Sequence, residues 1–200
     1  MALRPAKCYR SLERPYTRIS IHVPRKSYVK GVPVGKIHRF EMGNKNPAYT
    51  LRIDLVAVQG VQIRHNALEA ARVAANKGLD KWVGPNAYFL KILAYPHHVL
   101  RENPLATGAG ADRFSTGMRQ SFGNPISTAA RVLHGRRIMS VWVEPGKGVP
   151  AKRAFKVAAS KVPTPCLFVE STTPGAGMPA IPAGRRTAAG PSAASAGAAS

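Results

Sequence analysis

Acidic residues are scarce in this 200-residue chain: 9 Asp and Glu stand against 30 Lys and Arg, and the formal net charge is +21. Such an excess favours a polyanionic partner, because each Lys or Arg placed beside a phosphate releases condensed counterions. Cysteine is also rare. Cys8 and Cys166 form no C-x-x-C pair, so no zinc site or disulfide framework can be read, and a reducing compartment is expected. Nucleic acid is the first candidate partner.

Long apolar runs are missing as well. The uninterrupted apolar runs, such as those at residues 55–58 and 141–143, are far shorter than the roughly 18 to 20 residues of a membrane span, so we expect no membrane partner. Four prolines before residue 34 interrupt any amphipathic transit helix, and we interpret the N-terminus as mature protein. Hydrophobic residues make up 44% of the chain, too many for a purely disordered basic tail. Part of the chain must fold.

Composition divides the chain into three regions. Residues 1–45 are expected to be a basic extension that becomes ordered when phosphates neutralise it. Tyr9, Tyr16 and Tyr28 either stack on bases or pack on the domain. Residues 171–200 are rich in Ala, Gly, Ser and Pro and are expected to be disordered alone. Residues 46–170 carry the periodic patterns of a globular domain.

The first half of this domain predicts a strand and a helix. Residues 50–58 begin with strict alternation, with Leu51, Ile53 and Leu55 on one face and Arg52 and Asp54 on the other, as a half-buried strand requires. Asn66 is the expected N-cap of a helix that closes at Gly78. Its narrow apolar face, Leu68, Ala71 and Ala75, suits close packing.

The second half predicts more strands and a second helix. Strands are expected at residues 87–94 and 98–101, joined around Pro96, and residues 128–133 with 137–143 are expected to form a hairpin that turns at His134-Gly135. A helix over 149–162 has Pro150 in its first turn and an apolar stripe of Ala151, Ala154, Phe155 and Ala158. A last strand covers 166–169. The prediction is α+β: a single-domain, two-layer sandwich of mixed or antiparallel sheet with two main helices, a basic N-terminal extension, a long internal loop and a low-complexity C-terminal tail.

The internal loop at residues 103–125 is the candidate functional segment. Loops of this length inside a compact domain are uncommon unless they are functional or disordered. Gly108-Ala-Gly110 is a weak match to a phosphate cradle, because a dinucleotide-binding spacing needs glycine where Arg113 stands. A basic, aromatic loop that reaches along folded RNA is the favoured interpretation, and a plain solvent loop is the alternative.

Catalytic and metal-binding residues cannot be assembled. Asp112 is the only carboxylate in the loop, and the six histidines form no i, i+4 ligand pair in a predicted helix. His97 and His98 are adjacent in an extended segment, so one is expected to pack inward and the other to face outward. We expect neither an enzyme nor a bound cofactor or metal.

Several segments resemble one ribosomal protein family. They are residues 3–10, 15–18, 31–33, 67–72 and 98–101, and above all Gly108-Ala-Gly-Ala-Asp-Arg113 with Ser115-Thr-Gly-Met-Arg119 and Phe122-Gly123. In this order and spacing they resemble the large-subunit ribosomal protein ten-e family, the archaeal and eukaryotic counterpart of bacterial large-subunit protein sixteen. The resemblance covers about residues 2–170.

The resemblance implies a structural constituent of the large ribosomal subunit in the cytoplasm. Its α+β sandwich would bind large-subunit rRNA near the base of the central protuberance, beside neighbouring large-subunit proteins. Its loop would point toward the peptidyl transferase centre and the acceptor ends of A-site and P-site tRNA. The family has no enzymatic activity of its own.

Two sets of candidate contact residues follow. The loop set is Gly108, Gly110, Asp112, Arg113, Ser115, Thr116, Gly117, Met118, Arg119 and Phe122. The extension set for rRNA is Arg4, Lys7, Arg10, Arg14, Arg18, Arg25, Lys26, Lys30, Lys36 and Arg39. Arg113 and Arg119 are expected to contact RNA, with Met118 and Phe122 as apolar supports.

The chain also departs from the family pattern. Tyr95-Pro-His-His98 replaces the usual His-Pro-Phe-His, so no role is assigned to His97. The longer C-terminal region of eukaryotic members is absent, which favours an archaeal type, and the tail matches nothing in the family. A free RNA chaperone and an RNA-modifying enzyme are the alternatives; the enzyme would need an acid/base pair that the loop does not offer.

Overall fold

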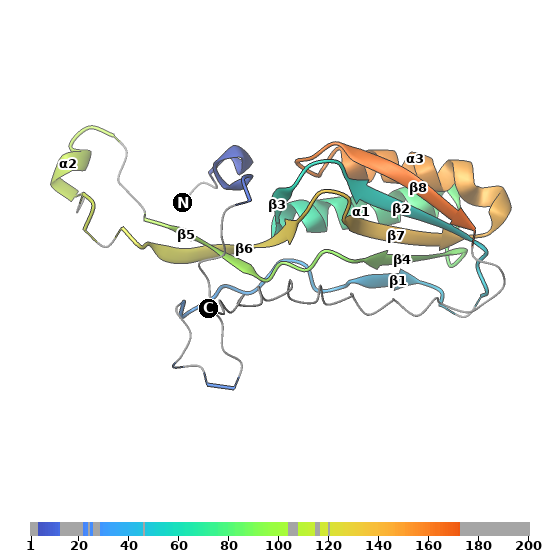
Figure 1. The fold of residues 1–200 in the computed structure, drawn as a ribbon, viewed down its shortest axis with the longest axis horizontal. Helices are drawn as coiled ribbons and strands as arrows, with labels where there is room; N and C mark the ends of the chain where they lie inside the picture. The colour runs from blue at the N-terminus through green and yellow to red at the C-terminus, as the bar shows by residue number, and fades with distance from the viewer. Residues whose placement is uncertain are drawn as a thin grey trace, which may run out of the picture.

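The computed structural model describes residues 4–12, 22–23, 25, 29–45, 47–103, 108–114, 117–119 and 121–172. Two antiparallel sheets organise them (Figure 1). Five strands form the larger sheet in the order β1-β4-β7-β2-β8: β1 (Glu41–Gly43), β4 (Tyr88–Ile92), β7 (Arg137–Val143), β2 (Leu51–Ala57) and β8 (Cys166–Thr172). The smaller sheet has the order β3-β6-β5, with β3 (Val61–Arg64), β6 (Asn124–Val132) and β5 (His98–Glu102).

Two long helices pack together against the larger sheet, α1 (His65–Trp82) and α3 (Gly148–Ala159). The predicted apolar stripe of α3, Ala151, Ala154, Phe155 and Ala158, is fully buried. It meets Leu68, Ala71 and Ala75 of α1 in a single core that includes Ile53 and Leu55 of β2. The predicted α+β class with two main helices is therefore confirmed, and both sheets are antiparallel.

The predicted limits of the first helix are wrong at both ends. The helix begins at His65 directly after β3, and Asn66 lies inside it, where its side-chain oxygen accepts a bond from the Ala67 amide at 2.9 Å. Gly78 does not end the helix, which continues to Trp82. A Cβ at Gly78 would lie 2.9 Å from the Cβ of Ala154. Glycine stands there because α3 approaches closely.

The predicted hairpin of residues 128–133 and 137–143 is also wrong. A turn does occur at His134-Gly135, with Gly135 at φ +71, but the two strands diverge into different sheets. β6 pairs with β3 and β5, whereas β7 pairs with β2 and β4. Alternation predicts that a segment is a strand without fixing its partner, because pairing depends on distant residues.

Asp54 lies on the face of β2 that alternation predicts to be polar and exposed, but its side chain is buried. It is only 5% exposed, because Arg52 binds its carboxylate through Nε at 2.8 Å and Ser140 also donates to it. Arg52 in turn lies over the ring of Trp142, 5.7 Å from the centroid. This polar cluster covers the sheet face opposite the helices.

Several short elements were not predicted, among them β1, β3 and the 3-10 helix η1 (Ala6–Tyr9). Another 3-10 turn, η3 (Pro145–Lys147), leads into α3. β1 lies at the end of the segment expected to be an extension, and it pairs with β4 through Glu41, Met42 and Gly43. Val29 and Ile37 are buried as well. The last part of that segment thus packs on the domain.

Within the part of the chain that the structure describes, no helix is long and apolar enough to span a bilayer.

Candidate nucleic-acid interface

An arm projects from the body of the molecule. It consists of β5, β6 and residues 103–123 between them, and Figure 1 shows it extending away from both helices with α2 (Ala111–Phe114) at its far end. The predicted irregular loop therefore contains one helical turn. Residues 104–107, 115–116 and 120 lie outside the described residues.

The tip of the arm exposes basic and apolar groups. Arg113 lies in α2 and is exposed, and Gly117, Met118 and Arg119 follow in an exposed turn. Met118 is 82% exposed, more than its expected role as an apolar support implies. Gly108 and Gly110 have φ values of +137 and +75 and are also exposed. Such a surface is accessible to a partner with negatively charged phosphates and flat aromatic bases.

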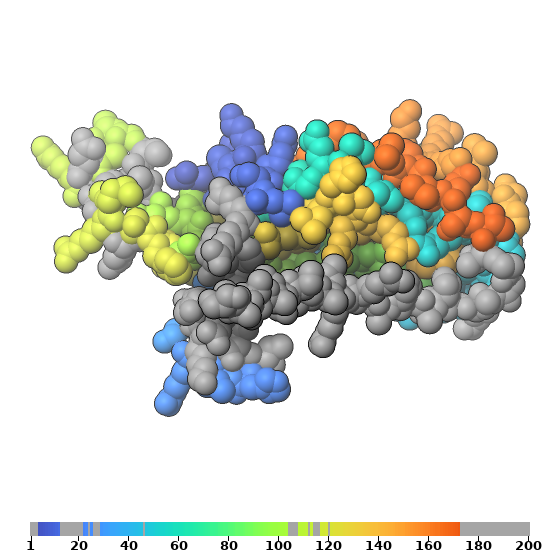
Figure 2. Space-filling model, viewed as in Figure 1, coloured from blue at the N-terminus to red at the C-terminus, as the bar shows by residue number. Residues whose placement is uncertain are grey.

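Some members of the loop set fall outside what is described. Ser115 and Thr116 lie outside the described residues, and only the backbone of Asp112 is described. The remaining members cluster on the arm, as Figure 2 shows where it protrudes in green and yellow from the body.

The base of the arm is held by Arg101. Its guanidinium lies over the Phe122 ring, 3.3 Å from the centroid, and donates to the Phe122 carbonyl oxygen. Beside it, Gly123 has φ +74, and a Cβ there would lie 2.6 Å from the Glu102 carbonyl carbon. Phe122 thus packs at the base of the arm through a cation–π contact with Arg101.

The N-terminal segment 4–12 also contacts the base of the arm. Arg4 forms an ion pair with Glu102, and the Tyr9 hydroxyl donates to that carboxylate at 3.0 Å. Arg64 lies 5.6 Å above the Tyr9 ring and donates to the Arg4 carbonyl oxygen at 2.9 Å. Tyr9 therefore packs on the domain, which settles its two predicted alternatives; Tyr16 and Tyr28 lie outside the described residues.

The extension set is mostly exposed where it is described. Lys7, Arg10, Arg25, Lys30, Lys36 and Arg39 are all exposed, and Arg4 is half-exposed beside Glu102. Arg14, Arg18 and Lys26 lie outside the described residues. Exposed lysines and arginines of this density are typical of a phosphate-binding surface.

Two buried histidines have lowered pKa values, first because of their burial and then because of nearby basic side chains. Burial, with Arg131 and Arg101 nearby, lowers the pKa of His98, so the ring is uncharged at neutral pH. Burial, Lys36 and Arg64 lower the pKa of His65, which hydrogen-bonds Thr128 at 3.0 Å. His97 is exposed, as the alternation predicts. Among the described residues, no group of three His, Cys, Asp or Glu could hold a metal ion.

Sequence reasoning missed Glu102, Arg64 and Arg101. Glu102 was the available signal, since it is one of only nine acidic residues and stands where a strand enters the loop. Through its contacts with Arg4 and Tyr9, the Glu102 carboxylate holds the basic segment 4–12 in place.

Comparison with known proteins decides the family. The model for ribosomal protein L16p/L10e matches residues 16–169, and so includes the whole arm. The chain belongs to the ribosomal protein L16p/L10e family.

Its relatives in that family are archaeal. The chain is 53% identical over 170 residues to the large ribosomal subunit protein uL16 of Staphylothermus marinus, covering 84% of this chain and 94% of the relative. It is 50% identical over 169 residues to that of Archaeoglobus fulgidus, covering 84% and 93%. For Methanoculleus marisnigri the identity is 47% over 177 residues, covering 88% and 100%. The expected archaeal-type L16p/L10e resemblance is confirmed.

Proposed function

We propose that this protein is a structural constituent of the large subunit of cytoplasmic ribosomes, where it binds large-subunit rRNA and contacts neighbouring ribosomal proteins. The observation that carries the proposal is the L16p/L10e match, which spans the sandwich and the arm together. The net charge of +21 and the exposed lysines and arginines support rRNA as the main partner. No catalytic role is proposed; the alternatives of a free chaperone and an RNA-modifying enzyme gain no support from the site.

The three regions take different roles in this proposal. Residues 1–45 anchor the protein to rRNA, the globular domain 46–170 supplies shape, and its loop 103–125 reaches the acceptor ends of A-site and P-site tRNA near the peptidyl transferase centre. Phosphate neutralisation makes binding steeply salt-dependent, while folded rRNA supplies specificity. No function is proposed for residues 171–200.

The loop is the part that a substitution can separate from anchoring. Arg113 lies in α2, which Figure 1 shows at the far end of the arm from the packed core, and Arg119 lies in the exposed turn that follows. Arg113→Ala with Arg119→Ala should leave incorporation into large subunits unchanged and weaken tRNA binding about tenfold or more, because each lost charge-assisted phosphate contact contributes roughly 1.5 to 3 kcal/mol.

The matched control is Lys81→Ala with Lys156→Ala, which removes two exposed charges from α1 and α3. Filter binding of acceptor-end tRNA fragments to purified subunits measures the effect. Loss of incorporation with normal tRNA binding in the remaining subunits would reverse the roles of loop and extension.

A further inference from the structure

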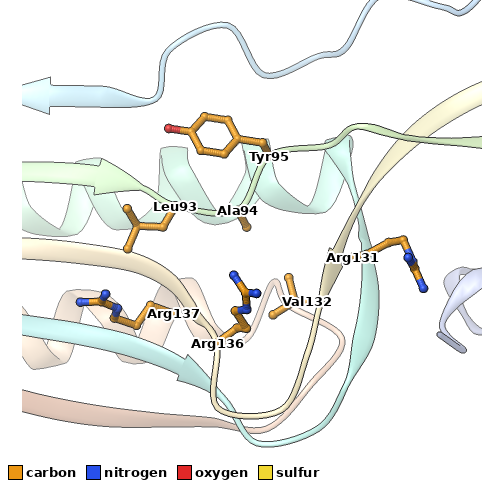
Figure 3. A pocket seen from close by; sticks show the side chains of 7 residues that line it. All are labelled: Leu93, Ala94, Tyr95, Arg131, Val132, Arg136 and Arg137. Atoms are coloured by element: carbon orange, nitrogen blue, oxygen red, sulfur yellow. The ribbon is translucent and has the colours of Figure 1, made fainter. Parts of the chain in front are cut away.

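A cavity of about 320 Å³ opens where the chain passes from one sheet to the other (Figure 3). Its lining comes from residues 93–95, in the connection between β4 and β5, and from the end of β6, the turn after it and the first residue of β7. Both segments pass from one sheet to the other at this point, and the Leu93 and Ala94 amides donate to the Ile138 carbonyl oxygen at 2.8 and 3.3 Å. Its volume lies at the lower end of the range for ligand pockets. We call it the seam cavity.

One side of the seam cavity is apolar and aromatic. Leu93, Ala94 and Val132 line it, and Tyr95 borders it while remaining 42% exposed. The Tyr95 ring is held in place by neighbours: the Phe40 ring lies 4.8 Å away and the His97 ring 5.9 Å away, centroid to centroid. Figure 3 shows this ring on the other side of the chain from the Leu93 and Ala94 side chains, so a flat ligand on the apolar floor would meet Tyr95 only at the rim of the cavity.

The other side is strongly basic. Arg131, Arg136 and Arg137 line it, and no carboxylate stands among the described residues that form the wall. Arg137 also forms an ion pair with Asp54, with 3.5 Å between its Nη1 and the carboxylate Oδ2. Figure 3 shows Arg136 between the other two arginines, with its guanidinium directed toward Ala94. Within the described part of the chain, the Arg136 side chain has no ion pair or hydrogen bond.

We propose that the seam cavity binds one unpaired nucleotide of rRNA, with its phosphate on Arg136 and its base against the apolar floor, where Tyr95 borders the rim. A guanidinium binds phosphate oxygens through two parallel hydrogen bonds. Bases that leave the helical stack are recognised in RNA by aromatic rings and guanidinium planes. An acidic peptide would use the arginines but leave the aromatic and apolar side without a role.

The inference rests on the proposed function, since it assigns one contact within rRNA binding. It also separates this cavity from the arm: the arm meets RNA at exposed side chains, whereas the seam takes a single nucleotide into a recess. The nucleotide must be unpaired in the rRNA, because a paired base is held in its own helix.

Chemical probing at nucleotide resolution tests the proposal. The full chain is bound to large-subunit particles stripped of it by a high-salt wash, and unpaired bases are probed with dimethyl sulfate and a 2′-hydroxyl acylating reagent. Wild-type protein should protect one unpaired nucleotide that Arg136→Ala and Tyr95→Ala expose about tenfold, while the rest of the footprint stays. Tyr95→Phe should retain the protection. Lys156→Ala, on the outer face of α3, is the charge control and should leave every position unchanged.

The outcomes separate the two claims. No footprint from the wild-type protein would overturn the proposed function itself. A normal footprint that Arg136→Ala leaves unchanged at every nucleotide would overturn the seam assignment alone, and would favour a protein partner for the cavity. A uniform weakening of the whole footprint would also overturn it, because general charge would then explain the effect. Equal melting temperatures of the variants exclude misfolding as the cause.

Discussion

The Tyr9 hydroxyl donates a hydrogen bond to the Glu102 carboxylate at 3.0 Å across 93 residues of sequence. Arg4 pairs with the same carboxylate. Glu102 ends β5, where the chain leaves the sheet and enters the arm. One acidic side chain therefore ties the N-terminal segment to the base of the arm, and the two candidate RNA-binding regions meet at one place.

Glu102→Ala should release the segment 4–12. The substitution removes the acceptor for both Arg4 and Tyr9, and a hydrogen bond to a charged group contributes roughly 1.5 to 3 kcal/mol, so local opening becomes about tenfold or more easier. Limited trypsin digestion measures cleavage after Lys7 and Arg10. Glu144→Ala is the control, because among the described residues Glu144 forms its ion pair with neighbouring Lys147 on the surface. Equal cleavage rates in Glu102→Ala and wild type would contradict the contact.

The ionisation of Tyr9 should report the same contact. Burial, followed by the hydrogen bond and charge of Glu102, raises the pKa of Tyr9 from 10.0 to about 12. The folded state holds the proton more tightly than the unfolded state, so this stabilisation is complete below pH 10 and is lost as pH rises toward 12.

Absorbance of tyrosinate at 295 nm, taken as the difference between wild type and Tyr9→Phe, gives the midpoint. We expect it near 12, and Glu102→Ala should lower it. A midpoint near 10 in the wild-type protein would show that the Tyr9 hydroxyl does not form the hydrogen bond to Glu102.

Gly123→Ala should destabilise the base of the arm. The position has φ +74, and a Cβ would lie 2.6 Å from backbone of Glu102 and 2.8 Å from the Asn103 nitrogen. Left-handed backbone costs about 1 to 2 kcal/mol in a non-glycine residue, and overpacking adds about 1 to 3 kcal/mol. Urea denaturation should show a loss of about 2 to 5 kcal/mol in the free energy of unfolding.

Gly117→Ala is the matched control for that experiment. Its φ is +60, but a Cβ there meets none of the described residues. The backbone cost remains and the steric cost disappears, so its loss should be clearly smaller. Equal losses for the two variants would show that Gly123 is required by its φ alone.

Gly78→Val should weaken the packing of α1 against α3. The Cβ of any side chain at this position would lie 2.9 Å from Ala154 Cβ and 3.1 Å from the Trp82 ring. Valine adds two methyl groups to this contact, and overpacking of this kind costs about 1 to 3 kcal/mol. Thermal unfolding measures the change, and Lys77→Val at the exposed neighbour is the control. A melting temperature as high as that of the control would contradict the close packing of α1 against α3 at Gly78.

Gly78 also shows what the sequence could not predict. In a helical pattern a glycine after Lys77 indicates a helix end, and nothing local distinguishes it from a glycine kept small for a neighbouring helix. The neighbour is Ala154, 76 positions away. Likewise, alternation in residues 128–133 and 137–143 correctly predicts two strands, but their partners, β3 and β2 among them, are set by contacts elsewhere in the chain.

Patterns that depend on local residues predicted more. The stripe Ala151, Ala154, Phe155 and Ala158 is buried as expected, because helical period alone defines it. His98 is buried and His97 exposed, because neighbouring residues of a strand point to opposite faces. For the candidate site, composition predicted a nucleic-acid partner, and the long internal loop predicted at 103–125 lies in the arm formed with β5 and β6. The Glu102 contacts and the seam cavity needed three-dimensional placement, because their residues come from distant segments.

The most direct test of the account is a cryo-electron microscopy map of large subunits that contain this chain together with acceptor-end tRNA fragments. The account predicts one copy per subunit, seated on rRNA, with the arm directed at the peptidyl transferase centre and with Arg113 or Arg119 within hydrogen-bond distance of RNA. A map in which the chain is bound but its arm points away from the tRNA sites would contradict the proposed role of the arm. Particles that lack the chain altogether would contradict the account as a whole.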